Sequence, residues 1–326
     1  MALVGNNQSG EILPCDKKRE HIFGPVPSRR LGRSLGVDLV PFKTCTYDCI
    51  YCQLGRTTNK TMQRKEWVPI DVVIKQLKEK LNANPDYITL SGSGEPTLFS
   101  PLEELIFKIK DITNIPVAVL TNGSLLWLPE VREALKLADL VIPSLDAGSN
   151  RIFQYVNRPH SDITFRKMLE GLVKFRNEYK GNYWLEVFIL AGVNTPEAEI
   201  KKLKTHISTI CPDKVQVNTV TRPPAEDFAE PATQKQLEAI AKQLYENAEV
   251  IADYSSVHKQ QDFLARREDV LALLKRRPCS VEDIAAGLGL HRNEVVKYVE
   301  ELCSEGKIET AKKSNKLYYK VALRSH

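Results

Sequence analysis

The sequence lacks any uninterrupted apolar run of the length that a membrane-spanning helix requires, which is about 20 residues. Residues 1–20 contain glycine, amides and charged groups but no apolar core of a signal peptide. Internal repeats at solenoid periods and low-complexity tracts are also missing. These absences disfavour membrane, exported and repeat proteins, and they predict a cytoplasmic chain without a membrane partner.

Neither charge nor apolar character dominates the composition. Hydrophobic residues make up 42% of the chain and charged residues 27%, the balance of an ordinary globular protein. With 326 residues, the chain is long enough for one domain of about 200 to 250 residues and a small appendage. We therefore expect two hydrophobic cores.

A disulfide framework and a complete zinc site are both missing from the cysteine pattern. Three of the seven cysteines fall in one short stretch, Cys45, Cys49 and Cys52, with no further cysteine or histidine close by in the sequence. The other four are scattered, and we predict ordinary thiols for Cys15, Cys211, Cys279 and Cys303. No second cluster motif is visible, which disfavours methylthiolation or similar sulfur chemistry, since that chemistry commonly uses an auxiliary cluster.

Short apolar runs alternate with amphipathic stretches between about residues 35 and 220, a pattern typical of βα units and a parallel sheet. Six strands are predicted, each nearly continuously apolar, as in strands covered on both faces: 35–40, 87–91, 117–121, 140–144, 184–190 and 214–220. Helices are predicted at 70–81, 101–112, 128–137, 165–179, 196–210 and 233–247. The pattern predicts an α/β fold, a partial (βα)6 TIM-like barrel, although an open doubly wound sheet would bury the same strands.

The C-terminal part of the sequence changes character after a polar connector. Helices are predicted at 268–275, 280–288 and 292–304, followed by strands at 307–310 and 317–321, with Ser314 and Asn315 in the turn between them. This order is typical of a winged helix-turn-helix domain. The predicted organisation is an N-terminal extension (1–24), a barrel domain (25–250), a linker (251–264) and a winged helix domain (265–326).

The three clustered cysteines have the spacing C-x3-C-x2-C and directly follow the first predicted strand. Three thiolates on one short loop can bind three irons of a [4Fe–4S] cluster and leave the fourth iron open to another ligand. The loop after a parallel strand is also where α/β folds place their chemistry. A zinc site and a Cys49/Cys52 redox pair are the alternatives.

This spacing, with the aromatic Tyr51 before the last cysteine, resembles the signature of the radical S-adenosylmethionine (SAM) superfamily. The resemblance covers roughly residues 25–225 and includes the sequence SGSGEPT at 91–97, after the second predicted strand. It implies a [4Fe–4S] cluster, SAM as a second cofactor, and reductive cleavage of SAM to methionine and a 5′-deoxyadenosyl radical that abstracts hydrogen from a substrate. It also implies an electron donor such as flavodoxin or ferredoxin.

The resemblance also assigns SAM-binding residues to the ends of several strands. In the family the glycine-rich motif contacts the methionine amino group, and a carboxylate beside glycines suits a cationic ammonium group. The residues that it implicates are Tyr51, Gly92, Ser93, Gly94, Glu95, Thr121, Asn122, Ser144, Asp146 and Val193. Ser93 departs from the glycine of many relatives, and turn chemistry alone is the alternative for Asn122 and Asp146.

Four arginines are candidate substrate-binding residues. Arg29, Arg30 and Arg33, in the opening PSRRLGRSLG, and Arg222, in the later RPP sequence, lie in segments that resemble a subgroup related to tRNA wyosine-forming enzymes. Arginine offers planar, bidentate donors to phosphate or carboxylate, so we expect Arg29, Arg30 and Arg33 at the barrel mouth. Arg222 lies beside two prolines that place it rigidly, and we expect it to face the substrate. A solvated basic turn and a structural salt bridge are the alternatives.

The charge of the C-terminal part bears on partners. Residues 265–326 hold 13 Lys and Arg against 9 Asp and Glu, which favours nucleic acid, but the predicted reading helix contains Glu294, Glu300 and Glu301. Three functions remain open: a radical SAM enzyme that modifies RNA such as tRNA, one that modifies a protein or peptide (including glycyl-radical activation) docked on the winged helix, and an iron–sulfur transcriptional sensor. Co-purified nucleic acid would separate the first two.

Overall fold

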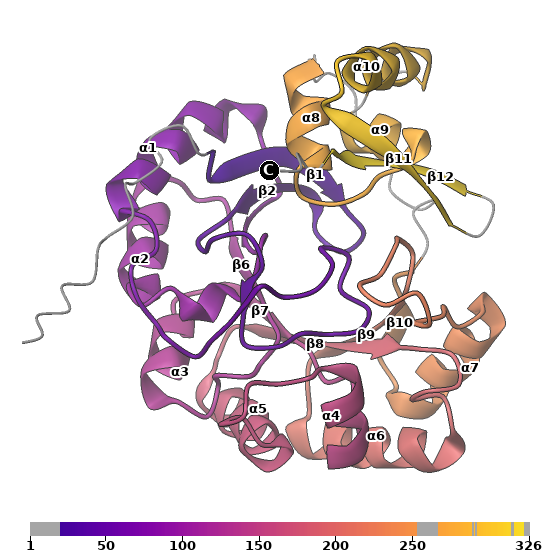
Figure 1. Cartoon of the computed structure of the whole chain (residues 1–326). Helices are drawn as coiled ribbons and strands as arrows, with labels where there is room; N and C mark the ends of the chain where they lie inside the picture. The colour runs from indigo at the N-terminus through magenta and orange to yellow at the C-terminus, as the bar shows by residue number, and fades with distance from the viewer. Residues whose placement is uncertain (1–19, 253–266, 289, 291, 314–315, 323–326) are drawn as a thin grey trace, which may run out of the picture.

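A curved, mostly parallel sheet forms the centre of the molecule (Figure 1). The structure is a computed structural model that describes residues 20–252, 267–288, 290, 292–313 and 316–322. Within these residues, none of the helices has both the length and the apolar character needed to span a membrane.

The sheet has eight strands in the order β1-β2-β5-β6-β7-β8-β9-β10. β1 is antiparallel to β2, and every other neighbouring pair is parallel. The strands are β1 (Ile22–Ser28), β2 (Gly32–Val37), β5 (Tyr87–Leu90), β6 (Val117–Thr121), β7 (Leu140–Pro143), β8 (Asn182–Ile189), β9 (Lys214–Thr219) and β10 (Ala248–Val250). Because β1 and β10 remain edges, the barrel is not closed.

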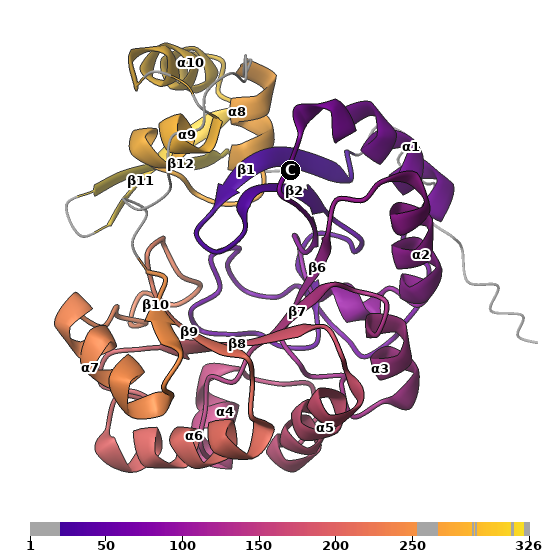
Figure 2. The ribbon, with the colours of Figure 1, turned by 180° about the vertical axis from the view of Figure 1, so that it is seen from behind.

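Helices follow one another around the outside of the sheet, as the two opposite views in Figures 1 and 2 show. They are α1 (Ile70–Lys80), α2 (Leu102–Ile112), α3 (Pro129–Leu135), α4 (Asn150–Val156), α5 (Phe165–Glu178), α6 (Glu197–Ile210) and α7 (Gln234–Leu244). Short elements complete this part of the chain: β3 (Thr44–Cys45), β4 (Asn59–Lys60) and the 3-10 turns Leu81–Ala83 and Pro96–Leu98. Apolar faces of these helices and the outward side chains of the strands form one large core.

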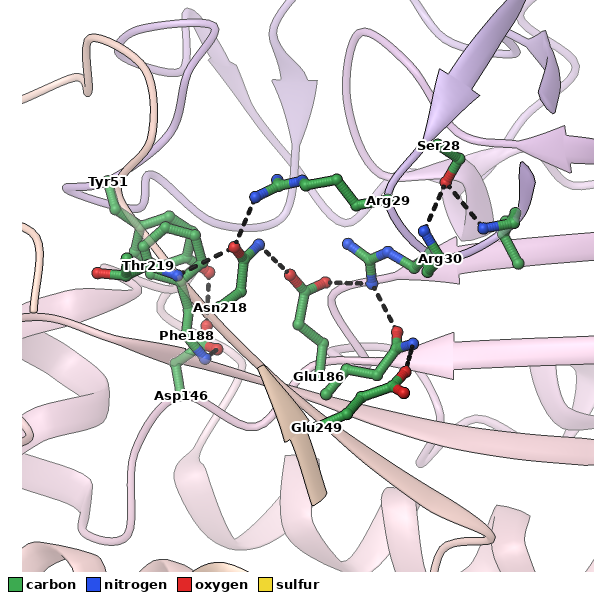
Figure 3. A network of polar contacts seen from close by, with 12 residues as sticks. Ser28, Arg29, Arg30, Tyr51, Asp146, Glu186, Phe188, Asn218, Thr219 and Glu249 are labelled. Atoms are coloured by element: carbon green, nitrogen blue, oxygen red, sulfur yellow. Dashed lines mark hydrogen bonds and ion pairs between the residues drawn. The ribbon is translucent and has the colours of Figure 1, made fainter. Parts of the chain in front are cut away.

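The two faces of the sheet differ in polarity. In β8, Tyr183, Leu185 and Val187 are fully buried in the core under the helices. Glu186, between them, instead joins a polar network inside the curved sheet (Figure 3). The expectation of nearly continuous apolar strands is therefore wrong for β8, because its inner face lines a polar interior.

The turn between β1 and β2 fills the amino end of this interior. The Ser28 hydroxyl accepts hydrogen bonds from the backbone of Arg30 and Leu31, at 3.4 and 3.2 Å. Leu31, which is 2% exposed, packs in a small apolar cluster with Ala118 and Leu140 from β6 and β7. The turn thus closes the amino end of the interior of the sheet, and the loops at the carboxyl ends of the strands surround its opposite end.

The C-terminal segment, described between residues 267 and 322, contains three helices and one hairpin. These are α8 (Arg267–Leu274), α9 (Val281–Leu288), α10 (Arg292–Ser304), and the antiparallel strands β11 (Ile308–Lys313) and β12 (Lys316–Val321). Its apolar cluster includes Val26 of β1, and Phe23 of the same strand packs against this cluster. The segment therefore sits on the antiparallel edge of the sheet, and it is the second core that the length of the chain predicted.

All six predicted parallel strands are present as β2 and β5–β9, within a few residues of their expected bounds. The sequence patterns missed β1, α4 and β10, and β1 begins inside the predicted N-terminal extension. The three C-terminal helices and two strands have the predicted order, and the name winged helix stays a prediction. Ser314, Asn315 and most of the predicted linker lie outside the described residues.

Candidate active site

The cysteine loop lies at the carboxyl end of β2, and backbone hydrogen bonds fix it against the C-terminal end of α4. The N–H of Asp48 donates to Asn157 O and that of Ile50 to Val156 O, each at 3.0 Å. Cys45 ends β3, and the N–H of Cys52 donates to Cys49 O at 3.1 Å. These backbone hydrogen bonds therefore define the shape of the loop.

The thiols suit a cluster better than a single metal ion. Among the residues described, no group of three His, Cys, Asp or Glu side chains converges as one metal ion requires, whereas in a cluster each thiolate binds its own iron. Asn122 Nδ2 points at Cys45 Sγ and Asn157 Nδ2 at Cys49 Sγ, both at 3.5 Å, and N–H donors around sulfur are typical of iron–sulfur sites. Burial raises the pKa of Cys45 to about 12, so bound iron must displace the proton.

The glycine-rich loop is joined to the cysteine loop by backbone hydrogen bonds. The N–H of Lys43 donates to Ser93 O at 2.7 Å, and the N–H of Glu95 donates to Thr44 O at 3.2 Å. A Cβ on Gly94 would lie 1.8 Å from Thr44 O, which no side chain tolerates. Position 94 therefore requires glycine because two backbone segments meet there.

Glu95 is 2% exposed, and four donors hold its carboxylate. Oε1 accepts from Thr97 N at 3.1 Å, Thr97 Oγ1 at 2.6 Å and Thr121 Oγ1 at 2.5 Å, and Oε2 accepts from Asn122 N at 2.8 Å. Burial raises the pKa of Glu95, and these hydrogen bonds oppose that rise. Thr121 and Asn122, both SAM-binding candidates from the sequence, thus lie beside the glycine-rich loop.

A second buried carboxylate, Asp146, organises the opposite side of the loop. Oδ2 accepts from the Tyr51 hydroxyl at 2.5 Å and from Asn157 Nδ2 at 2.8 Å, and Oδ1 accepts from Phe188 N at 3.0 Å. Burial raises the pKa of Asp146 to about 6, although these donors oppose the rise. The Tyr51 ring stacks on Phe188 with centroids 3.9 Å apart, so Tyr51 is fixed at both its face and its hydroxyl (Figure 3).

The weaker candidates from the sequence lie close to this region. Ser144 forms an isolated β-bridge with Glu186. Val193 is half-buried and packs against the apolar cluster of Ile50 and Leu190, which Tyr51 also contacts. Both therefore lie near the cysteine loop, and their role in SAM binding stays a prediction.

Two of the four arginines reach the interior of the sheet from the β1–β2 turn (Figure 3). Arg29 Nη1 donates to Asn218 Oδ1 at 3.0 Å. Arg30 Nη1 pairs with Glu186 Oε2 at 2.9 Å, with side chains 10% and 15% exposed. Both project from the turn at the amino ends of the strands. Arg30 meets Glu186 in the middle of β8, so the expected mouth location is wrong for Arg30, whereas the Arg29 guanidinium extends toward the mouth, to Asn218 near the carboxyl end of β9.

Arg33 and Arg222 have different surroundings. Arg33 Nη2 donates to Ala83 O at 2.7 Å near the start of β2, away from the cysteine loop, so a mouth position is wrong for Arg33 also. Arg222 Nη1 donates to Gln53 Oε1 at 3.2 Å, directly after the cysteine loop, and its residue is 4% exposed. Of the four, Arg222 lies at the mouth.

Sequence patterns missed several residues that support the site, namely Asp38, Asn157, Glu186 and Phe188. Asn194, next to the predicted Val193, also supports it. Asn194 is fully buried, and its Nδ2 donates to both Asp146 O and Phe188 O, at 2.8 and 2.7 Å. The only local signal for Asp38 and Glu186 was a charge in an otherwise apolar strand. Asn157 follows the helix that the periodicity did not show, and nothing in the sequence marked it.

Comparison with known proteins agrees with this geometry. The model of the radical SAM superfamily matches residues 39–205, which contain both the cysteine loop and the glycine-rich loop. The chain belongs to the radical SAM superfamily, and a [4Fe–4S] cluster and SAM are its cofactors. It is thus an enzyme of that superfamily, whose reaction the matches do not specify.

The UPF0026 proteins are relatives that match over nearly their whole length. The one from Methanocaldococcus jannaschii is 34% identical over 314 residues, covering 93% of this chain and 96% of that protein. A UPF0026 protein of Helicobacter pylori is 35% identical over 306 residues, covering 91% and 96%. A protein of Brachyspira hyodysenteriae named GTPase Obg is 42% identical over 296 residues, but this chain spans only 44% of its length and contains no G-x-x-x-x-G-K-[ST] sequence of P-loop GTPases.

Solved structures share the fold at low identity. A radical SAM methyltransferase from Sphaerobacter thermophilus has a TM-score of 0.50 at 15% identity, covering 67% of this chain and 66% of that one. Streptococcus suis SuiB, solved with bound S-adenosylmethionine, has a TM-score of 0.50 at 13% identity, covering 69% and 52%. These likenesses establish the α/β fold with its mostly parallel, open sheet.

Proposed function

We propose that this chain cleaves SAM reductively on a cluster held by Cys45, Cys49 and Cys52 and uses the resulting radical to modify RNA, with tRNA as the substrate class. The observation that carries the proposal is the direct backbone junction between the cysteine loop and the glycine-rich loop, Lys43 N to Ser93 O and Glu95 N to Thr44 O. This junction supports the proposal because it brings the cysteine loop next to the glycine-rich loop, which would bind the SAM amine.

The bound cofactors would supply electron transfer to the sulfonium and a 5′-deoxyadenosyl radical that abstracts hydrogen. The protein's own residues position them. Asn122 and Asn157 donate toward the sulfurs of Cys45 and Cys49, and such donors help to set the potential of a cluster. An electron donor such as flavodoxin or ferredoxin would reduce the site in the cytoplasm.

SAM would bind along the carboxyl ends of β5–β8. Glu95 Oε2 accepts one hydrogen bond that the structure describes, from Asn122 N, and a carboxylate oxygen has a second lone pair for an ammonium group. Gly92, Ser93 and Gly94 bring backbone to the ligand, and Thr121 and Ser144 flank it. On the other side Tyr51, Asp146 and Val193 border the volume that the ribose and adenine would need.

Two features support RNA as substrate. The tRNA-2-methylthio-N(6)-dimethylallyladenosine synthase of Syntrophomonas wolfei is 28% identical over 171 residues, 48% of this chain and 36% of that protein. The sequences around Arg29 and Arg222 resemble the wyosine-related subgroup, and Arg29, Arg30 and Arg222 offer guanidinium groups suited to phosphate. The C-terminal segment, acting as a winged helix, would dock on the tRNA and hold it at the site.

One observation favours a protein or peptide substrate as the second candidate. Glu300 and Glu301 on α10 are exposed, and acidic groups on a reading helix repel phosphates. Arg292, at the start of that helix, already pairs with Glu282 at 3.3 Å. A protein docked on this segment would tolerate that charge.

The proposal is tested by assaying 5′-deoxyadenosine after anaerobic reconstitution with iron and sulfide, reduction with dithionite and addition of SAM. Formation is expected in the wild type and in Cys211→Ala, whose cysteine is exposed and outside the site, but not in the Cys45/Cys49/Cys52→Ala variant. Stimulation by bulk tRNA supports RNA, and stimulation only by protein fractions supports the second candidate. An intact cluster without 5′-deoxyadenosine under any condition would overturn the enzymatic proposal in favour of a sensor.

A further inference from the structure

The C-terminal segment reaches the glycine-rich loop through one arginine. Arg276, just after α8, donates from Nη1 to the Asp38 carboxylate and to Ser93 Oγ, the latter at 3.3 Å. Its Nη2 donates to Glu20 O at 3.0 Å, and the guanidinium lies 4.4 Å from the centroid of the Phe23 ring. The Arg276 side chain is only 14% exposed. A cation from the end of the chain is thus buried behind a loop some 180 residues earlier in the sequence.

Asp38 connects this cation to the loop. Asp38 is 1% exposed, and its Oδ1 accepts from Ser93 N at 3.0 Å while Oδ2 accepts from Ser93 Oγ at 2.5 Å. Gly92 has φ +148°, and a Cβ there would lie 2.8 Å from the Asp38 carboxyl carbon. The Asp38 carboxylate therefore fixes the backbone of Gly92 and Ser93 from behind.

The charge of Arg276 makes this arrangement stable. A buried carboxylate that loses a cationic partner is strongly destabilised, because it has already lost its hydration. Arg276 also shares Oδ2 of Asp38 with the Ser93 hydroxyl. Removing the guanidinium would therefore disturb the loop, and not only the contact between the two parts of the chain.

Other contacts determine where Arg276 lies. Val26 and Phe23 of β1 pack with the apolar cluster of the C-terminal segment. On β12, the Tyr318 hydroxyl donates to Thr221 O at 3.0 Å, in the loop after β9. The segment thus contacts the sheet at β1 and at the loop beyond β9, and Figure 2 shows it beside the β1 edge. Its docked position and the place of Arg276 are set together.

We propose that Arg276 is a positioning residue for SAM binding: through Asp38 and Ser93 it holds the 92–94 loop in its binding conformation, so docking of the C-terminal segment and SAM affinity are coupled. The inference rests on the assignment of this loop to SAM in the proposed function. Coupling of this kind is reciprocal. A macromolecule that displaces the segment would weaken SAM binding, and SAM would oppose the displacement.

The test compares Arg276→Met and Arg276→Lys with a matched control, Arg267→Met. Arg267 lies on the same segment and pairs with Glu305 at 2.7 Å, but it has no described contact with the loop. The readouts on the reconstituted holoenzyme are SAM affinity by equilibrium dialysis and iron per chain. In the protein without cluster, hydrogen exchange is followed in the peptide that contains the Ser93 amide.

Arg276→Met is expected to weaken SAM binding by roughly 10- to 100-fold, the range that loss of a supporting contact behind a ligand-binding residue gives at metal sites. Iron content should stay unchanged, Ser93 exchange should accelerate, and Arg276→Lys should recover part of the affinity because it keeps the charge. Arg267→Met should bind SAM within about twofold of wild type, as expected for a surface pair. Wild-type affinity and wild-type Ser93 exchange in Arg276→Met would overturn the inference.

If Arg276→Met does not fold, the comparison moves to the Asp38→Asn background. Without the carboxylate Arg276 keeps only its longer hydrogen bond to Ser93 Oγ, at 3.3 Å, so Asp38→Asn and Asp38→Asn/Arg276→Met should bind SAM with nearly the same affinity. A further tenfold loss in the double variant would show that Arg276 does not act through Asp38 and would overturn the inference.

Glu95→Ala separates this result from the proposed function. Unchanged SAM binding in Glu95→Ala would mean that the loop is not the SAM site, and both proposals on the loop would fail. Loss in Glu95→Ala with no loss in Arg276→Met would remove the coupling alone.

Discussion

The ion pair between Arg30 and Glu186, inside the curved sheet, allows a quantitative prediction. Arg30 Nη1 and Glu186 Oε2 lie 2.9 Å apart, with side chains 10% and 15% exposed. Glu186 Oε1 also accepts from Asn218 Nδ2 at 2.8 Å, and Arg30 donates to Gln216 Oε1 at 3.4 Å. We propose a cycle of three variants: Arg30→Met, Glu186→Gln and the double variant.

The expected magnitudes follow from which group loses its partner. Arg30→Met leaves the Glu186 carboxylate buried with one neutral donor, Asn218, and with the charge of Arg29 as its remaining cationic neighbour. Breaking a buried pair costs about 3–5 kcal/mol of unfolding free energy, and Arg29 places this loss at the lower end of that range. Glu186→Gln keeps an oxygen for Asn218 and removes one charged hydrogen bond, a loss of about 1.5–3 kcal/mol. The double variant should lose less than the sum, with a coupling of about 1–3 kcal/mol.

The pH dependence has a definite sign. Burial raises the pKa of Glu186, but the charge of Arg30 and the hydrogen bonds from Arg30 and Asn218 outweigh it, so the pKa lies below its ordinary value. A carboxyl whose pKa is lower in the folded protein stabilises the fold above the unfolded pKa, about 4.3. This stabilisation is lost as pH falls through the folded pKa. The loss of unfolding free energy caused by Arg30→Met should therefore be largest at pH 7 and become smaller below about pH 4.

Urea unfolding followed by tryptophan fluorescence measures these effects, since Trp184 packs with the apolar cluster at the amino end of the same interior. The control cycle uses Lys201 and Glu197, a surface pair whose side chains are 74% and 75% exposed. No coupling is expected there. Additive single variants at Arg30 and Glu186, or an Arg30→Met penalty independent of pH, would refute the reasoning.

Three further predictions concern individual side chains. Glu95→Gln should place an amide NH2 against the N–H of Asn122, which costs about 1–3 kcal/mol of stability for an unsatisfied donor and lowers SAM affinity. Thermal unfolding measures the loss of stability and equilibrium dialysis the loss of affinity. Unchanged values in both assays would contradict the role of the carboxylate. Tyr51→Phe keeps the ring stack but removes the hydrogen bond to Asp146. The melting temperature should fall, corresponding to a loss of about 1.5–3 kcal/mol of unfolding free energy, while the iron content per chain stays unchanged. A melting temperature equal to that of the wild type would argue against that hydrogen bond. Arg132→Met removes a pair with Glu178 and two hydrogen bonds to carbonyls that lie outside the cysteine and glycine-rich loops. It should lower stability by about 1–3 kcal/mol without changing 5′-deoxyadenosine formation at low temperature. Impaired formation in folded protein would contradict this separation.

Local sequence signals predicted the alternating elements well, because βα units repeat apolar runs at two distinct periods. The strand at 184–190 was predicted, but its polar inner face was not. A buried Glu186 is expected only once the fold brings Arg30 opposite it as an ion-pair partner. β1 was missed because Pro25 and Pro27 interrupt the strand pattern of its sequence. β10 was missed because three residues give no periodicity.

The cysteine spacing and the SGSGEPT sequence by themselves determined the cofactor chemistry of this protein. The reason is that residues close together in the sequence supply both the cluster ligands and the glycines that let the backbone come near a ligand. Tertiary structure alone decided which charges support them. Asp38, Asp146 and Arg276 meet their partners across 55, 95 and 238 residues of chain, and no local pattern encodes such pairings. Burial gives these pairings their strength, since a charge removed from water depends on the partner that the fold brings to it.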